Sequence, residues 1–189
     1  YLGGRIARHL ATTGKASLRL ATRRQDAERP AWCADMAVAM IDDNANLDAL
    51  CNGTRAIVHL AGANEHLSAA DPQRALADTT ADTLRLLGAA ERQGVERFIY
   101  LSTAHVYGAP LRGRIDESCL PRPLHPYAIT HRAAEDFVLA AHQRGALEAA
   151  VLRLSNGLGA PADPLIDRWT LIGNDLCRQA VATGRLTLH

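Results

Sequence analysis

The chain has 189 residues, of which 48% are hydrophobic and 22% are charged, enough apolar material for one globular core. Its 21 Lys and Arg residues nearly balance its 20 Asp and Glu residues, and the formal net charge of +1 argues against a nucleic acid or an anionic membrane as partner. The four cysteines form no C-x-x-C pair, which argues against a zinc site and a disulfide scaffold and favours free thiols in a cytoplasmic protein.

Neither a membrane helix nor a secretion signal is expected, because no apolar run approaches the roughly 20 residues that a bilayer requires. Both ends of the sequence look cut. The chain opens with Tyr1, residues 1–12 already have the period of a helix, and residues 185–189 resemble the beginning of a strand. We therefore expect the interior of a longer protein.

Short apolar runs rich in β-branched residues alternate with stretches of helical period, which predicts βαβ units in a parallel sheet. Strands are expected at residues 17–22, 36–41, 56–60, 97–102 and 149–154. The last three are nearly continuous apolar runs, a pattern typical of central strands that are covered on both faces.

A long helix is predicted from Asp71, a good N-cap, to the stop signal Gly94. A second long helix should run from Pro126 to about Gln143. Residues 108–125 are rich in proline and glycine and follow neither period, so they are expected to form a loop of functional length.

Ligands of parallel doubly wound sheets bind beyond the carboxyl ends of the strands, so the residues that follow each strand carry the functional signal. Gly3 and Gly4 open the first helix; they either face a pyrophosphate or form an ordinary turn. Arg23 and Arg24 follow the strand at 17–22. They either pair with the 2′-phosphate of a dinucleotide or are solvated loop arginines.

The strongest signal comes from two later places. Ser102 and Thr103 follow a buried strand, and Tyr127 and His131, four residues apart, share one face of the second long helix. A phenol beside an imidazole, with a hydroxyl from a neighbouring strand end, can pass a proton to or from a substrate oxygen.

Five segments, in this order, resemble the NAD-dependent epimerase/dehydratase family, the extended short-chain dehydrogenases. They are Val58-His-Leu-Ala-Gly62, the stretch 84–102, Val106-Tyr-Gly108, Pro126-Tyr127 and Leu152-Arg-Leu-Ser-Asn156. The resemblance implies an α/β fold of the Rossmann type, a doubly wound parallel sheet that binds NAD(P). It also implies a cofactor domain at residues 1–160 and the start of a substrate region at 161–189, with the first strand and most of the substrate lobe missing.

The resemblance implies a cofactor site. Gly3 would be the third glycine of G-x-x-G-x-x-G, Arg23 would discriminate NAD from NADP and favours NADP, and Asp42 or Asp43 would bond the adenine. The backbone of the turn Leu60, Ala61 and Gly62 would lie beside the ribose and pyrophosphate of the cofactor. The site would be completed by Ser102, Tyr127 and His131.

The catalytic residues that the resemblance implies are Thr103 as the family's Ser/Thr and Tyr127 as the tyrosine of Y-x-x-x-K. Asn156 would contact the substrate's phosphates. The family lysine is His131 here, and the usual asparagine and glycine of the long helix are replaced by Thr79 and Asp82. The lysine normally lowers the pKa of the tyrosine, whereas histidine is shorter and largely neutral near pH 7.

His131 is therefore either a working substitute for the lysine or a surface residue beside an abandoned site. Arg132 could supply positive charge nearby. His59 is expected to be a packed residue bonded to backbone, and His105 and His125 lie in loops from which they could touch substrate.

These observations predict an enzyme that transfers hydride to or from a nucleotide-activated sugar as an epimerase, dehydratase or reductase. Two alternatives stay open: an NADPH-dependent carbonyl reductase of the same superfamily, and a regulator that binds NAD(P) without turnover. The expected partner is a small-molecule substrate, without nucleic acid, membrane or metal. A homodimer is an open alternative to a monomer.

Overall fold

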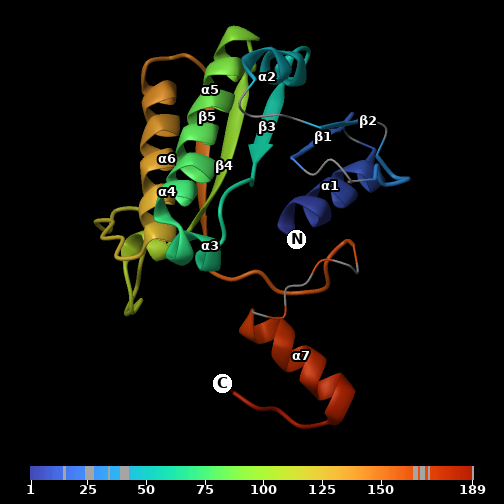
Figure 1. Cartoon of the computed structure of the whole chain (residues 1–189), viewed down its shortest axis with the longest axis vertical. Coiled ribbons are helices and arrows are strands. Elements are labelled where there is room, and N and C mark those ends of the chain that lie inside the picture. The colour runs from blue at the N-terminus through green and yellow to red at the C-terminus, as the bar shows by residue number, and fades with distance from the viewer. Residues whose placement is uncertain are drawn as a thin grey trace. The chain divides into compact units, whose positions relative to one another are not determined.

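The computed structural model describes residues 1–14, 16–23, 28–33, 35–38, 43–163, 166, 169 and 171–188 (Figure 1). The chain divides into two compact units. The first combines residues 1–37 with 156–189, and the second comprises residues 38–155. Among the described residues, no helix has both the length and the apolar character needed to cross a bilayer. All four cysteines are free thiols, as predicted.

The first unit contains a small sheet and two helices. Its elements are α1 (Leu2–Thr13), β1 (Arg19–Thr22), β2 (Asp35–Val38), which pairs with β1, and α7 (Ile172–Thr183). Hydrogen bonds tie the beginning of the chain to its end. The Tyr1 hydroxyl donates to the Gly159 carbonyl at 2.8 Å, and the Asn174 side chain bonds both Tyr1 and the Gly159 amide.

The second unit contains a parallel sheet with strand order β3-β4-β5. Its strands are β3 (Ala56–His59), β4 (Arg97–Thr103) and β5 (Glu148–Leu154), and its helices are α2 (Asn44–Cys51), α3 (Glu65–Ala70), α4 (Pro72–Ala75), α5 (Asp82–Arg92) and α6 (Pro126–Gln143). The prediction of parallel βαβ units is confirmed. All five predicted strands form close to their expected bounds, although residues 39–41 lie outside the described part of the chain.

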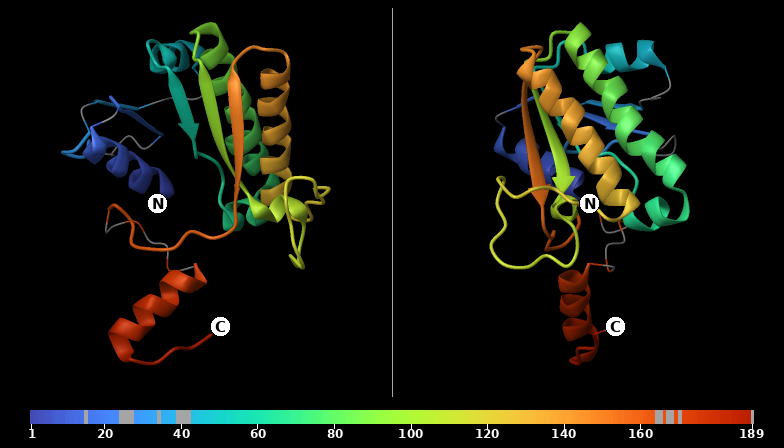
Figure 2. Two further views of the ribbon diagram at one scale, coloured as in Figure 1. Left: turned by 180° about the vertical axis from the view of Figure 1, so that it is seen from behind. Right: turned by 90° about the vertical axis from the view of Figure 1, so that its left-hand side faces the viewer.

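Helices α5 and α6 lie side by side along one face of this sheet (Figures 1 and 2). The core between them and the sheet includes Phe98 and Tyr100 of β4, Leu87 of α5 and Val138 of α6. Burying these apolar side chains stabilises the unit by roughly 1.5 to 3 kcal/mol for each large residue.

The prediction that all three central strands are covered on both faces is wrong for β3 and β5. Exposure alternates along β5, and Leu152, on the face away from the helices, is 47% exposed. Val58 of β3 and Leu154 of β5 are also exposed. Only β4, which has a strand on either side, is buried along most of its length. Apolar composition alone does not reveal which face of a strand has a partner.

The helix predicted over residues 71–94 is interrupted. A π-helical turn at Leu76–Ala81 separates α4 from α5. Such a turn inserts a residue into the helical repeat, so the buried positions before and after it fall out of phase. Leu76 and Leu84 are exposed, whereas Thr79 and Thr83 are buried.

Helix α6 has the predicted bounds, with Pro126 at its first position and His125 as its N-cap. The loop at 108–125 contains neither helix nor strand, as predicted. Gly108 at its start has φ of 102°, and a Cβ there would lie 2.9 Å from the Arg122 carbonyl oxygen. The loop returns because the Arg122 amide donates to the Val106 carbonyl at 2.9 Å, so only glycine fits this closure.

Two predictions about organisation stay untested: the domain boundary after residue 160 and the missing first strand.

Candidate active site

The candidate site lies at the carboxyl edge of the three-stranded sheet. Strand β4 ends there with Ser102 and Thr103, and the 108–125 loop projects from the same end of the sheet (Figure 2). Helix α6 begins after that loop. The Nδ1 atom of His125 accepts a hydrogen bond from the Tyr127 amide at 3.2 Å, which satisfies one of the free amides of the helix end. His125 is therefore a helix cap that orients the first turn of α6.

Tyr127 and His131 lie together, as their spacing predicted. Their ring centroids are 4.6 Å apart, and the planes meet edge to face at 66°. On the other side of Tyr127, the ring of His105 lies 6.4 Å away, also edge to face. His105 approaches the Glu65 carboxylate at 3.4 Å. The phenol is thus flanked by two imidazoles.

His131 is buried and neutral. Its Nδ1 atom lies 2.8 Å from the Tyr100 hydroxyl. Burial lowers the pKa of His131 to about 4, and the negative charge of Glu135 offsets this only in part. Burial also raises the pKa of Tyr100 above its ordinary range, with a further contribution from Glu135. The pair is therefore a neutral phenol and a neutral imidazole. The alternative prediction that His131 lies on the surface of the helix is wrong, because this residue is buried.

A polar cluster continues behind Tyr100 into the core. The Thr83 hydroxyl donates to the Thr79 carbonyl at 2.5 Å, and the Nε2 atom of His59 lies 3.0 Å from the Thr83 oxygen. Because the Thr83 proton is committed to Thr79, His59 must donate through Nε2. His59 is packed, as predicted, and its Nε2 atom contacts the Thr83 hydroxyl.

The two hydroxyls at the end of β4 differ in their bonding. Thr103 is buried, and its Oγ1 accepts from the His105 amide at 3.2 Å, which starts the 3-10 turn Ala104–Tyr107. The Oγ atom of Ser102 is fully buried and has no hydrogen-bond partner within the described part of the chain. An unsatisfied buried hydroxyl is costly, so Ser102 stands out as a group that a ligand or a water would satisfy.

One turn after His131, Glu135 is completely buried. Arg153 of β5 donates to its carboxylate from Nε at 3.0 Å and from Nη2 at 2.7 Å, and Nη1 donates to the Tyr107 hydroxyl at 2.7 Å. The carboxylate raises the pKa of Arg153 well above its usual value. This fork joins α6 to β5 and fixes the helix face that carries Tyr127 and His131.

Arg132 was expected to place positive charge near Tyr127. Its guanidinium instead binds two carboxylates, that of Glu135 at 3.2 Å and that of Asp136 at 2.6 Å. Its charge is largely balanced by these partners, so Arg132 offers little positive charge to Tyr127.

The turn Leu60, Ala61 and Gly62 follows β3, as predicted for a segment near a cofactor. It packs on Thr79, whose hydroxyl accepts from the Ala63 amide at 3.0 Å. A Cβ on Gly62 would approach the Thr79 oxygen to 3.2 Å. Glycine is therefore favoured at 62 by this internal contact, and contact of the turn with a cofactor stays a prediction.

The remaining predicted site residues belong to other elements of the fold. Gly3 lies in the first turn of α1, Arg23 follows β1, and Asn156 follows β5; all three belong to the first unit. Asp42 lies outside the described residues. Asp43 caps α2, since its carboxylate accepts from the Ala45 amide at 2.8 Å. The ligand roles of these residues stay predictions.

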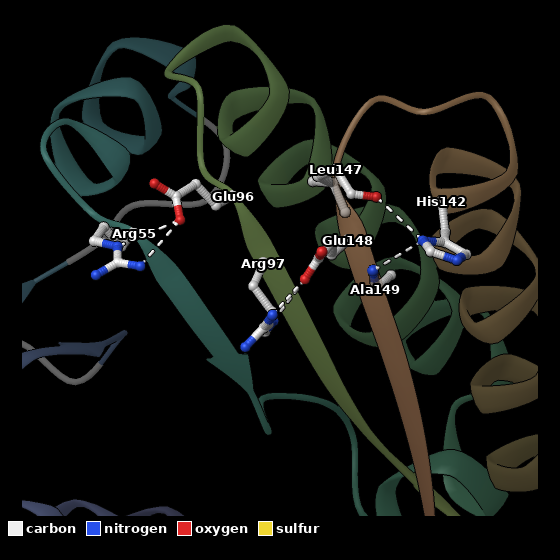
Figure 3. Close-up of polar contacts among 7 residues, drawn as sticks. All are labelled: Arg55, Glu96, Arg97, His142, Leu147, Glu148 and Ala149. Atoms are coloured by element: carbon white, nitrogen blue, oxygen red, sulfur yellow. Dashed lines mark hydrogen bonds and ion pairs between the residues drawn. The ribbon is translucent and has the colours of Figure 1, made fainter.

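The amino edge of the same sheet carries charged pairs and no comparable cluster among the described residues (Figure 3). Arg55 pairs with Glu96 at 3.2 Å, Arg97 pairs with Glu148, and all four side chains are exposed. Glu96, Arg97 and Glu148 border a depression of about 500 Å³ together with His142. Exposed ion pairs contribute little to stability, and ligands of such sheets bind at the opposite edge.

A parallel sheet with helices in its crossovers and polar groups at its carboxyl edge is typical of α/β domains of the Rossmann type. The model of the family described as "NAD dependent epimerase/dehydratase family" matches residues 1–170. The chain belongs to this family.

Among the curated relatives, UDP-glucose 4-epimerase of Rhizobium leguminosarum bv. trifolii is 33% identical over 132 residues, which cover 68% of this chain and 40% of the relative. The dTDP-D-glucose 4,6-dehydratase of Mus musculus is 43% identical over 74 residues, 39% of this chain and 21% of the relative. The chain thus spans well under two thirds of these relatives.

Among the solved structures, MoeE5 in complex with UDP-glucose and NAD superposes with a TM-score of 0.80 at 27% identity, over 95% of this chain and 57% of that one. This similarity confirms the Rossmann-type fold that the sequence predicted.

Proposed function

We propose that the full-length protein is an NAD(P)-dependent enzyme that acts on a nucleotide-activated sugar, with Tyr127 as its acid/base. The observation that carries the proposal is the contact of Tyr127 with His131 at the carboxyl edge of the sheet, beside the strand end that holds Thr103. The names of the relatives support the substrate class, because they are UDP-glucose 4-epimerases and dTDP-glucose 4,6-dehydratases.

The described residues fit a dinucleotide in one specific respect. Ser102 offers a buried hydroxyl without a protein partner at the edge where such folds bind ligands. MoeE5, which shares the fold, holds NAD together with UDP-glucose. When bound, the nicotinamide supplies the acceptor and donor of hydride.

The protein residues supply placement and proton transfer. The Tyr127 phenol exchanges a proton with a sugar hydroxyl, and Thr103 hydrogen bonds the same oxygen. His131 contributes a hydrogen bond from a neutral imidazole, since the Tyr100 contact and its low pKa keep it uncharged. Glu135 and Arg153 hold α6 against β5, so the phenol keeps its position during these steps.

The test is turnover of UDP-glucose and dTDP-glucose by the full-length protein with NAD and NADP. Tyr127→Phe should abolish most turnover and leave cofactor binding in place. Tyr107→Phe removes a phenol hydroxyl from the same part of the fold and should retain activity. If Tyr127→Phe turns over as fast as the unmodified protein, the proposed site is not the catalytic one.

One observation favours a second candidate, an NAD(P)-binding protein without turnover. His131 offers no positive charge in place of the family lysine, and Arg132 is paired with carboxylates. This candidate predicts cofactor binding without conversion of any nucleotide sugar. A carbonyl reductase would instead oxidise NADPH with a simple ketone or aldehyde. A homodimer stays a prediction, tested by light scattering.

A further inference from the structure

The buried phenol of Tyr100 is a polar group that the proposed reaction does not use. It is fully buried in β4, yet its hydroxyl faces an imidazole of α6. A phenylalanine would fill the same core space without placing a hydroxyl that must be satisfied. Packing alone therefore does not explain the Tyr100 hydroxyl.

The hydrogen bonds of this cluster restrict where its protons lie. His59 already donates to the Thr83 oxygen, whose own proton is given to the Thr79 carbonyl. The Tyr100 hydroxyl lies 2.8 Å from Nδ1 of His131. A phenol is an O–H donor and an unprotonated imidazole nitrogen is a good acceptor, so we infer that Tyr100 donates its proton to Nδ1.

A proton donated by Tyr100 to Nδ1 requires that Nδ1 carry none of its own. In the neutral ring the proton then sits on Nε2. Within the described part of the chain, the Tyr100 contact accounts for the hydrogen bonding of this ring. The Nε2 proton is therefore available to a ligand.

We propose that Tyr100 is a positioning residue, whose hydroxyl fixes His131 as the neutral tautomer protonated on Nε2 so that His131 is a donor toward the bound dinucleotide. The tautomer follows from the hydrogen bonds of the protein alone, and the role toward the ligand rests on the proposed function. The arrangement gives the position of the family lysine a directional donor without a charge. The groups that face His131 are Tyr100 of β4 and Tyr127 and Glu135 of α6.

The first experiment reads the tautomer directly. Full-length protein labelled with ¹⁵N is studied by long-range ¹H–¹⁵N correlation of the imidazoles at neutral pH, and His131→Gln assigns the signal. The expected spectrum shows His131 neutral, protonated on Nε2 and unprotonated on Nδ1. A proton on Nδ1, an even mixture of tautomers or an imidazolium overturns the proposal. This result does not depend on turnover, so it stands even if the proposed enzyme function fails.

The second experiment separates positioning from packing. Tyr100→Phe should give mixed tautomers at His131 and weaken NAD(P) binding about tenfold, the effect of one oriented hydrogen bond. Tyr107→Phe, which removes a phenol hydroxyl bonded to Arg153, should leave the His131 signals unchanged.

In a His131→Lys background, Tyr100→Phe should no longer change cofactor affinity, because an ammonium has no tautomers. If Tyr100→Phe lowers cofactor affinity equally in the unmodified and the His131→Lys proteins, Tyr100 acts through packing and the proposal is overturned. Should Tyr100→Phe fail to fold, as judged by circular dichroism, the tautomer in the unmodified protein still decides.

Discussion

The imidazole of His131 meets the ring of Tyr127 edge to face, with 4.6 Å between their centroids, and its Nδ1 atom faces the Tyr100 hydroxyl at 2.8 Å. His131 thus contacts two phenols, that of Tyr127 in the candidate site and that of Tyr100 in the core. The resemblance to the family implies a lysine at this position, and on that expectation a neutral ring stands here in place of a cation. The consequences are measurable.

Replacing His131 with Lys should move the pH dependence of turnover toward lower pH. An ammonium stabilises a nearby phenolate more strongly than a neutral imidazole does. The unmodified protein should therefore reach its maximal rate on the alkaline side, and the variant should reach it earlier. The measurement is kcat against pH for both proteins with a nucleotide sugar. Coincident profiles would show that the charge at position 131 does not act on Tyr127.

His131 should also make the fold sensitive to acid. Its pKa is lowered to about 4 by burial, while an unfolded histidine titrates near 6.5. Between these values the unfolded chain binds a proton that the folded chain does not, so stability falls as pH decreases from about 6.5 toward 4. The full loss should reach about 3 kcal/mol.

The measurement is urea unfolding from pH 7 to pH 4, compared with His131→Gln. The variant cannot take up this proton, so its stability should change less over the window. His66→Gln is the control, because this histidine lies exposed on α3. An equal acid loss in the unmodified protein and in His131→Gln would contradict the prediction.

Much of this fold could be predicted from local signals. Helix α6 has its predicted bounds because Pro126 sets the start and Gly145, with φ of 74°, follows the end. The strand positions follow from apolar runs. The exposed face of β5 could not be predicted, because strand composition records apolar character but not the presence of a covering layer.

The site could be predicted in part. A spacing of four residues on one helix placed Tyr127 beside His131. The Tyr100 contact is 31 residues distant along the chain and depends on how α6 packs on β4, which no local pattern contains. A tyrosine in a buried strand was nevertheless a usable signal, because its hydroxyl needs a partner. Glu135, four residues after His131 on the same face, was a second such signal.

Glu135 should prove essential for stability. It is completely buried against the guanidinium of Arg153. Glu135→Gln leaves that cation without its counter-charge, and breaking a buried pair in this way costs about 3 kcal/mol. Urea unfolding measures the loss. Glu148→Gln, which breaks the exposed pair with Arg97 at the opposite edge of the sheet (Figure 3), should change stability far less. If both variants lose a comparable free energy of unfolding, burial of the ion pair does not determine its contribution to stability.

Cofactor choice should favour NADPH over NADH. Arg23 follows β1, and the resemblance to the family implies that this position distinguishes the two cofactors. A charge-assisted bond to a 2′-phosphate contributes roughly 1.5 to 3 kcal/mol. Fluorescence titration of the full-length protein with both cofactors measures the preference, and Arg23→Ser should reduce it. MoeE5, in contrast, holds NAD. Equal or tighter binding of NADH would show that Arg23 does not bind a 2′-phosphate.

Ser102 should show opposite effects on stability and on binding. Its hydroxyl is buried without a protein partner among the described residues. Ser102→Ala removes an unsatisfied polar group, so the ligand-free protein should become more stable by about 1 kcal/mol. If the hydroxyl bonds a ligand, the same change should weaken NAD(P) or nucleotide-sugar binding several-fold. Thermal unfolding and titration, each with and without ligand, measure the two effects.

Thr103→Ala is the comparison, because the Thr103 oxygen already accepts from the His105 amide and its loss should destabilise the ligand-free protein. A Ser102→Ala protein that is less stable without ligand would mean that a water or another group satisfies this hydroxyl, and unchanged binding of every ligand would remove Ser102 from the site.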